Sequence, residues 1–354
     1  IANPLGEADP NVRATLSRLY LRAANYDKAI PLLVDLVRQQ PGWQDGPLLL
    51  AQAYSASGRT REGSDWLAQQ TENDPRLLPT LADFYERDAR WKEAADAYAK
   101  AVEIAPRNVD LQTRYAQALL NVGGRDNIVK ARNALGGVVS VRVNDVRALY
   151  LLSQAYRRSG DPAGAEAAAR RVITLQDASP WGYFALAEAL EARRQWDAVV
   201  TALTPAVEKF RGMAGDHTNE LGMLLPHLGF AHQELGRLDL AVSTFEEAHR
   251  LSPKDVAVTG YLVEANISAK KYVAAADLAR EARVDAPNDF RLARLQAQAM
   301  RLDGKTDQAV SLLEEAFKSH ADDATAYLGL AQLYADAARG PQAVTLLQEA
   351  VSKF

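Results

Sequence analysis

Apolar residues along this chain recur at the three- and four-residue spacing of amphipathic helices, and this pattern repeats about every 34 residues. Units typically carry Leu at the seventh position, a small residue at the eighth, Ala at the twentieth and Pro at the thirty-second. No stretch alternates strictly between apolar and polar residues, so no strand is predicted. Units are predicted to begin near Pro10, Gln44, Pro75, Val109, Val146, Pro180, Gly222, Val256, Phe290 and Ala324.

These positions have a packing reason. Small side chains at the eighth and twentieth positions let two antiparallel helices approach closely, and large residues at the seventh and twenty-fourth fill the space between turns. The predicted buried leucines at the seventh position are Leu16, Leu50, Leu81, Leu152, Leu186, Leu228, Leu262 and Leu330. Glycines mark the chain reversal after the first helix: Gly58, Gly123, Gly160, Gly236 and Gly304.

The repeat pattern resembles the tetratricopeptide repeat family, most clearly in LADFYERDARWKEAADAYAKAVEIAP (81–106) and LGFAHQELGRLDLAVSTFEEAHRLSP (228–253). The resemblance covers residues 10–354. It implies an all-α, right-handed superhelical solenoid of about ten helix-turn-helix repeats. It also implies a scaffold that binds other macromolecules, because the family serves unrelated processes through binding.

The period is interrupted after the sixth unit by RGMAGDHTNELGMLLPH. Since proline breaks the helical hydrogen-bond ladder, Pro226 predicts a late start or a bend in the following helix, and Pro205 predicts a kink in the helix before it. The interruption is either a tolerated loop insertion or a flexing point. The predicted organisation is a lead-in at 1–9, units one to six at 10–211, an irregular joint at 212–221 and units seven to ten at 222–354.

Composition narrows the function classes. With 41 basic and 45 acidic residues, the formal net charge is −4, so nucleic acid is not expected as a partner. The absence of cysteine excludes disulfides, thiolate metal sites and cysteine nucleophiles. No apolar run reaches the length of a membrane span, so no direct membrane insertion is expected. The chain begins at Ile1, and both ends are interpreted as processing boundaries that would have removed any targeting segment.

The same composition fits a bacterial envelope compartment somewhat better than a cytosol, without deciding between them. Four histidines fall close together, but His227 and His232 are five residues apart and diverge on a helix. His232 takes a packing position and is predicted to lie in the core or at its edge. No catalytic residue, metal site or cofactor is predicted.

The resemblance implies that the first helices line a concave face, to which positions two, five, nine and twelve contribute. Aromatic residues beside arginines on such a face have the composition of a binding hot spot. The predicted binding residues are Arg147, Tyr150, Gln154, Arg157, Trp181, Phe184, Glu188, Phe230, Tyr261, Arg291, Arg294, Gln298 and Arg301. Glu191, Met223 and Glu264 also occupy positions of this face, and Tyr261 lies beside them. The alternative interpretation is that the aromatic side chains pack against neighbouring repeats and the arginines form a solvated face.

The ninth position is Gln in five units, at Gln52, Gln117, Gln154, Gln298 and Gln332. Primary amides can hold an extended peptide backbone, although Gln is also a common residue of wet helix faces. Family members that clamp the carboxylate tails of chaperones have Lys and Asn at the fifth and ninth positions of the first unit. Ala14 and Arg18 stand there, which argues against such a clamp.

The sequence is compatible with three roles. The first is an adaptor that grips a protein or peptide along the concave face of units five to nine. The second is an assembly platform that associates with itself through terminal repeats. The third is the recognition arm of a larger envelope enzyme or complex.

Overall fold

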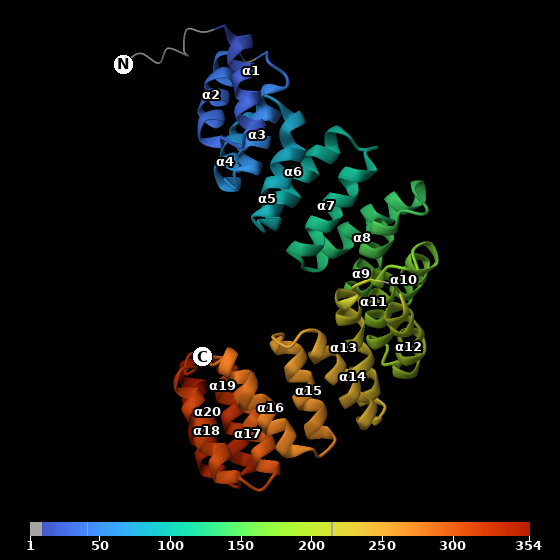
Figure 1. The fold of residues 1–354 in the computed structure, drawn as a ribbon, viewed down its shortest axis with the longest axis vertical. Helices are drawn as coiled ribbons and strands as arrows, with labels where there is room; N and C mark the ends of the chain where they lie inside the picture. The colour runs from blue at the N-terminus through green and yellow to red at the C-terminus, as the bar shows by residue number, and fades with distance from the viewer. Residues whose placement is uncertain (1–8, 41, 214) are drawn as a thin grey trace. The chain divides into compact units, whose positions relative to one another are not determined.

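The computed structural model describes residues 9–40, 42–213 and 215–354. This part of the chain is all-helical, with twenty α-helices, one 3-10 helix and no strand, which confirms the predicted fold class (Figure 1). Apart from residue 9, the predicted lead-in lies outside the described residues. By its internal contacts the chain forms two compact units, unit 1 at 1–168 and unit 2 at 169–354.

The helices alternate between first and second helices of a repeat. Those of unit 1 are α1 (Pro10–Arg22), α2 (Tyr26–Gln39), α3 (Gly46–Ala56), α4 (Thr60–Gln70), η1 (Pro75–Leu77), α5 (Leu78–Arg87), α6 (Trp91–Ile104), α7 (Val109–Val122), α8 (Arg125–Val141) and α9 (Val146–Arg158). The boundary between the units falls inside α10 (Pro162–Leu175).

Unit 2 continues the alternation. Its helices are α11 (Pro180–Glu191), α12 (Trp196–Gly212), α13 (Thr218–Glu234), α14 (Leu238–Leu251), α15 (Val256–Ser268), α16 (Tyr272–Asp285), α17 (Phe290–Leu302), α18 (Thr306–Lys318), α19 (Ala324–Asp336) and α20 (Gly340–Lys353). Across both units, seven first helices begin at the predicted unit starts Pro10, Val109, Val146, Pro180, Val256, Phe290 and Ala324.

The small residues of the repeat lie where the helices meet. At the twentieth position Ala94, Ala131, Ala241 and Ala309 are fully buried, and the seventh-position leucines from Leu50 to Leu330 are also buried. Leu16, in the first repeat, is only partly buried. An exception is Leu347, at the twenty-fourth position of the last unit, which is 38% exposed. The prediction that large residues at the twenty-fourth position are buried is wrong for Leu347, because no described helix covers this face of α20.

Short polar side chains set the starts of several first helices. Asn108, Asp145, Asp255, Asp289 and Asp323 each accept hydrogen bonds from backbone N–H groups in the first turn of the helix that follows. These groups would otherwise lack a partner within the helix. Of the second helices, α10 is capped in the same way, since Asp161 accepts from the Gly164 N–H at 2.9 Å. The others have no side-chain cap hydrogen bond.

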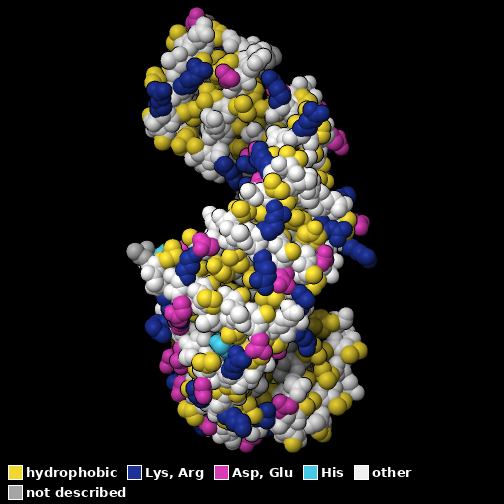
Figure 2. Space-filling model, turned by 90° about the vertical axis from the view of Figure 1, so that its right-hand side faces the viewer, with side chains coloured by type: hydrophobic (Ala, Val, Ile, Leu, Met, Phe, Trp, Pro, Cys, Tyr) yellow, Lys and Arg dark blue, Asp and Glu magenta, His cyan; other side chains and the backbone are white. Residues whose placement is uncertain are grey.

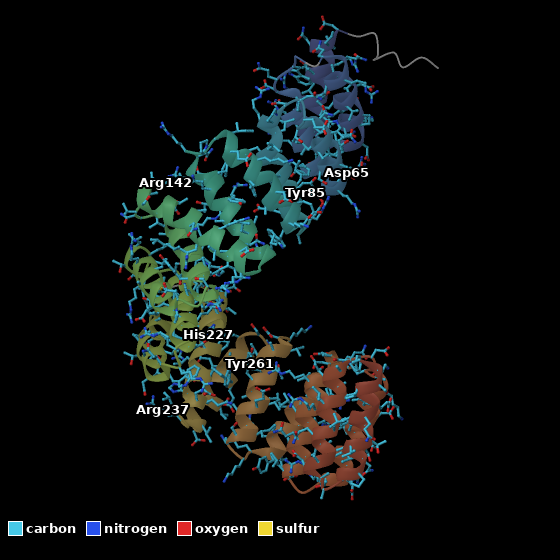
Figure 3. The ribbon with its side chains drawn as sticks, turned by 180° about the vertical axis from the view of Figure 1, so that it is seen from behind. Asp65, Tyr85, Arg142, His227, Arg237 and Tyr261 are labelled. Atoms are coloured by element: carbon cyan, nitrogen blue, oxygen red, sulfur yellow. The ribbon has the colours of Figure 1, made fainter. Side chains whose placement is uncertain are left out.

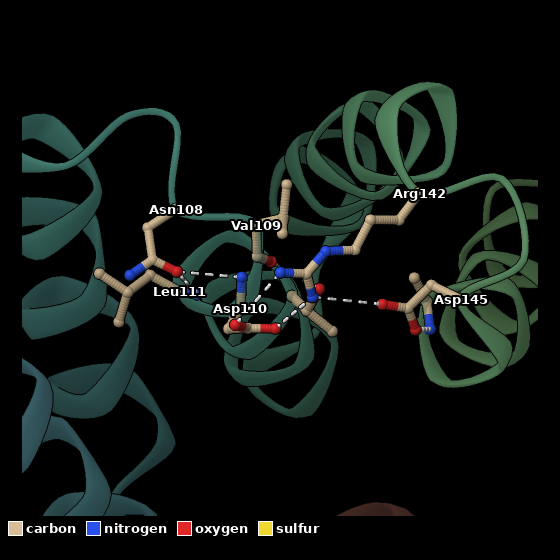
Figure 4. A network of polar contacts seen from close by, with 8 residues as sticks. Asn108, Val109, Asp110, Leu111, Arg142 and Asp145 are labelled. Atoms are coloured by element: carbon tan, nitrogen blue, oxygen red, sulfur yellow. Dashed lines mark hydrogen bonds and ion pairs between the residues drawn. The ribbon is translucent and has the colours of Figure 1, made fainter.

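Ion pairs connect the two ends of a repeat. Figure 4 shows this arrangement in unit 1, where Arg142 after α8 contacts Asp110 in the first turn of α7 at 2.6 Å and Asp145 at 3.9 Å. Lys209 and Asp177 make the equivalent pair in unit 2 at 2.6 Å. Solvent screens such exposed pairs and makes them weak, so they help fix the helix register while apolar burial supplies most of the stability.

The region of the predicted joint consists of the end of α12, the start of α13 and a short connection that includes residue 214, which lies outside the described residues. The late start considered for the seventh unit is wrong, because α13 begins at Thr218 and carries Pro226 in its interior. Burial of Leu224, Leu225 and Leu228 around this proline favours the continued helix. Whether 212–221 acts as a joint stays a prediction; the division by contacts lies inside α10 instead.

The predicted packing role of His232 is confirmed, since this residue lies on α13 and is only 8% exposed. Burial, and to a smaller extent the charge of Arg237, lower the pKa of this imidazole below its usual value. The folded protein therefore binds a proton at His232 less readily than the unfolded chain does.

We predict that His232 makes stability pH-dependent. Its neutral form contributes fully above the unfolded-state pKa near 6.5, and this contribution is lost as the pH falls toward the lower folded-state pKa. Urea unfolding of His232→Phe should show a smaller loss of stability between about pH 7 and pH 5 than the wild type. An unchanged pH dependence would assign the effect to other groups.

Every repeat turns through a residue with positive φ, and the fourth repeat turns through two, Gly123 and Gly124. All five predicted turn glycines have this conformation, and in the other repeats the place is taken by Ala24, Ala89, Arg194, Lys270 and Ala338, with φ between 53° and 61°. A left-handed conformation costs a residue with a Cβ about 1–2 kcal/mol, whereas glycine adopts it without a steric penalty.

We predict that Ala89→Gly stabilises the protein by about 0.5–1 kcal/mol. The substitution removes the strain of the left-handed conformation, and the energy released exceeds the entropy cost of introducing glycine. Ala89 is exposed, so no packing is lost. The matched control is Gly160→Ala, at φ 81°, which should destabilise by a similar amount. Urea midpoints measure both, and a fall for Ala89→Gly would contradict the strain argument.

Candidate functional site

The first helices of unit 2 form one continuous face. Helix α11 packs on α13, α13 on α15, α15 on α17 and α17 on α19. The predicted residues of this unit lie on these helices: Trp181, Phe184 and Glu188 on α11, Phe230 on α13, Tyr261 on α15, and Arg291, Arg294, Gln298 and Arg301 on α17. In Figure 3 the labelled His227 and Tyr261 lie close together on neighbouring helices of this unit.

A hollow of about 250 Å³ opens between α11, α13, α14 and α15, and we call it the aromatic pocket. It is lined by Glu191, Pro226, His227, Phe230, Phe245 and Tyr261. Phe230 and Tyr261 are partly exposed, at 39% and 37%, whereas Phe245 is buried. Gly229 allows Phe245 to reach this position, since a Cβ there would lie 2.9 Å from the ring.

Ring contacts fix the walls of the aromatic pocket. The edge of Trp196 meets Phe230 with ring centroids 5.4 Å apart, and Phe245 lies 5.9 Å from Tyr261. On the other side Phe184 packs edge-on against His227 at 5.0 Å, and Trp181 packs on Phe184 at 6.4 Å. These geometries are favourable for aromatic pairs and hold the side chains in defined orientations.

Two charged contacts border the same pocket. His227 Nδ1 lies 2.7 Å from Glu191 Oε1, which joins α13 to α11. The guanidinium of Arg291 lies 5.2 Å from the Tyr261 ring centroid, and its Nη2 atom donates to Glu264 Oε1 at 3.0 Å. Arg291 is therefore oriented by both a cation–π contact and an ion pair.

A second hollow of about 370 Å³ lies between α17 and α19, and we call it the arginine groove. Its lining residues are Arg294, Gln298, Arg301, Leu313, Thr325, Leu328, Gly329, Gln332, Leu333 and Asp336. Arg301 pairs with Asp336 at 3.3 Å, and Gln332 Nε2 donates to the same carboxylate at 2.8 Å. Gly329 gives room for Arg294, because a Cβ there would lie 3.1 Å from Arg294 Cδ.

Arg294 differs from the other two arginines of α17. Arg291 and Arg301 each have a carboxylate partner, whereas Arg294 forms no hydrogen bond or ion pair with the rest of the described chain. The arginine groove thus carries one positive charge more than its own carboxylate neutralises. An unpaired guanidinium with fixed neighbours is suited to bind a carboxylate or another planar anion.

Unit 1 presents a different face. The predicted residues Arg147 and Gln154 are engaged internally: Arg147 donates to Gln117 Oε1 at 2.6 Å, and Gln154 donates to the Tyr150 hydroxyl at 2.8 Å. Asp83 accepts from Tyr98 at 2.5 Å and also pairs with Arg114. Burial raises the pKa of Glu86 on the same helix as Asp83. Tyr150 and Arg157 have further contacts, and their role in binding stays a prediction.

Sequence reasoning missed part of the lining. The sequence pattern does not assign His227, Phe245 or Asp336 to the binding face. The place of Phe245 at the twenty-fourth position and that of Gly229 at the eighth could have indicated a deep aromatic floor, but the pairing of His227 with Glu191 joins different repeats.

Other kinds of site have no support in the described residues. No group of three or more His, Asp or Glu side chains in the described ranges could hold a metal ion. None of the helices that the structure describes is long and apolar enough to cross a membrane. Figure 2 shows basic, acidic and apolar side chains interspersed over one face of the molecule, without a large basic patch on that face.

Comparison with known proteins is consistent with this architecture. Two family models, both described as tetratricopeptide repeat, match residues 115–180, 233–299 and 300–354, which together are more than half of the chain. Cellulose synthase operon protein C of Pseudomonas fluorescens is 27% identical over 150 residues, or 39% of this chain and 12% of that protein. Tetratricopeptide repeat protein 8 of Caenorhabditis elegans is 22% identical over 228 residues, 63% of this chain and 44% of that protein. The chain thus matches less than half the length of either curated relative.

Two solved structures share the fold. Yeast Tom70 superposes with a TM-score of 0.53 at 13% identity, covering 98% of this chain and 86% of that chain. A tetratricopeptide repeat protein from Parabacteroides merdae gives a TM-score of 0.52 at 13% identity, covering 72% of this chain and 97% of that chain. These low identities indicate a common fold and nothing about partners.

The two phenylalanines of the aromatic pocket should differ in their effect on folding. Phe245→Ala removes a buried ring and should destabilise by about 3–5 kcal/mol, whereas Phe230→Ala removes a partly exposed ring and should cost about 1 kcal/mol. Urea unfolding monitored by circular dichroism measures both. Equal large losses would support the alternative that Phe230 serves packing between repeats.

Proposed function

Because the chain belongs to the tetratricopeptide repeat family, whose members act in general as protein-interaction scaffolds, we propose that it binds an extended segment of a partner protein along the first helices of unit 2. The proposal places binding, and not catalysis, on this face. The sequence predicts a binding surface on repeats five to nine. The proposal restricts this surface to the part that runs from the aromatic pocket to the arginine groove.

The observation that carries the proposal is the unneutralised Arg294 in the arginine groove. A partner carboxylate bound there would gain charge-assisted hydrogen bonds without breaking an existing ion pair of the protein. Asp336 already holds Arg301 in place, so part of the groove is organised before binding. Preorganisation of this kind lowers the entropy cost of association.

The rest of the arginine groove suits a peptide main chain. Gln298 and Gln332 offer primary amides that can donate to and accept from peptide groups. Leu328, which is 62% exposed, offers an apolar surface beside them. Backbone amide contacts would give affinity with little sequence preference, and the arginine would select an acidic position.

The two other roles stay predictions. Exposed Val344 and Val351 lie on one side of α20 and would suit self-association. The chain matches 12% and 44% of the lengths of its two curated relatives, which is compatible with the recognition arm of a larger protein. Neither role depends on the arginine groove, so both can be separated from peptide binding.

The test uses peptides selected on the whole chain from a random library displayed on phage, followed by fluorescence anisotropy with purified peptide. We expect the selected peptides to contain Asp, Glu or a free carboxylate terminus, and we expect Arg294→Glu to weaken them about tenfold or more. Peptides that are amidated at the terminus, with and without an internal acidic residue, distinguish the two carboxylate sources.

The matched control is Arg280→Glu. Arg280 lies on the second helix α16, is exposed, and pairs with Asp277 on its own helix, so its reversal changes the net charge equally without touching the face. Equal weakening by both variants would mean that only net charge matters. Unchanged binding in Arg294→Glu, or the absence of any selected peptide, would overturn the proposal.

A further inference from the structure

The aromatic pocket carries a negative charge of its own. Among its six described lining residues Glu191 is the carboxylate, and none is lysine or arginine. Its other walls are the rings of His227, Phe230, Phe245 and Tyr261 together with Pro226. With this carboxylate the pocket is not purely apolar, although its aromatic residues alone would make it so.

Glu191 is held in position but is not neutralised by a guanidinium or an ammonium group. Its Oε1 atom contacts His227 Nδ1 at 2.7 Å, and both side chains are 20% exposed. No other hydrogen bond or ion pair of the Glu191 side chain occurs within the described chain. The second carboxylate oxygen is therefore available to a ligand.

The rings add to the same preference. The faces of aromatic rings carry negative potential and attract cations. Arg291 already lies over the Tyr261 ring at 5.2 Å, so this ring has the orientation to accept a guanidinium on one face. The charge of Arg291 is matched by Glu264, which leaves Glu191 as the charge that an occupant of the pocket would meet.

An apolar side chain would be a poor occupant. It would remove water from the second oxygen of the Glu191 carboxylate without replacing the lost hydrogen bonds, and this desolvation of a charged group is unfavourable. A lysine or arginine side chain would instead place its hydrocarbon stem against the rings and its charged end at the carboxylate. The volume of about 250 Å³ accommodates a single long side chain and not a folded element.

We propose that the aromatic pocket receives a lysine or arginine side chain of the partner, with the cation paired to Glu191 and the stem packed on Phe230 and Tyr261. The inference rests on the proposed function, since it supplies the partner chemistry for the same face. The preferred segment then has a basic residue near α11 and α13 and an acidic residue near α17 and α19, which sets its direction along the helices.

The experiment uses the whole chain and two small probes, Nα-acetyl-lysine methylamide and its neutral analogue Nα-acetyl-norleucine methylamide. Ligand-observed NMR titration measures their dissociation constants. The lysine probe should bind about tenfold more tightly than the norleucine probe, and Glu191→Gln should remove most of this difference. Glutamine keeps the shape and an acceptor for His227, so the pocket should stay intact.

Two variants sharpen the result. Glu264→Gln removes a carboxylate of the same face that does not line the pocket, and it should leave the preference for lysine unchanged. Phe230→Ala should weaken both probes, because it removes a wall of the pocket. Equal binding of the two probes to the wild type, or equal effects of Glu191→Gln and Glu264→Gln, would overturn the inference.

The outcome is distinguishable from failure of the proposed function. Selected peptides that lose affinity in Arg294→Glu but not in Glu191→Gln would uphold binding along the face and reject the cation pocket. If the lysine probe binds through Glu191 but the selected peptides bind Arg294→Glu as tightly as the wild type, the cation pocket would be upheld and the proposed binding at the arginine groove rejected. Circular dichroism of each variant confirms that the helices are retained.

Discussion

The close approach of two helices within each repeat depends on small residues at two fixed positions. Ala131 and Ala241 are fully buried at one of them, and Gly229 at the other leaves room for the Phe245 ring. A larger side chain at either place would separate the helices and open voids around the leucines. The positions of the first helices, and hence of every residue on their common face, follow from this packing.

The turn between the helices is the second constraint, and it is met in two ways. Gly58 and Gly160 adopt the left-handed conformation without strain, whereas Arg194 and Lys270 adopt it at a cost. The strained residues persist because packing on both sides determines the path of the chain. Capping by Asp255 and Asp289 then fixes where the next first helices begin.

The face that results in unit 2 is chemically divided. Around α13 it is aromatic with a carboxylate at Glu191, and around α17 it is cationic with an unpaired Arg294. Arg291 connects the two parts through its contacts with Tyr261 and Glu264. For the partner segment that we propose, this arrangement would favour complementary charges in a defined order, because a reversed segment would place like charges together.

The sequence alone determined the all-α class, the number of repeats and the starts of most first helices, because these depend on local periodicity, caps and turns. The start of α13 was misplaced, since the burial of Leu224 and Leu225 overrides the local signals of Gly222 and Pro226. Only the tertiary structure decided which face residues are paired. Glu191 and His227, or Arg301 and Asp336, belong to different repeats, and their contact depends on the offset between helices and on side-chain rotamers. A periodic sequence pattern contains neither quantity, so it identifies the residues of the face but not the free arginine or the carboxylate in the aromatic pocket.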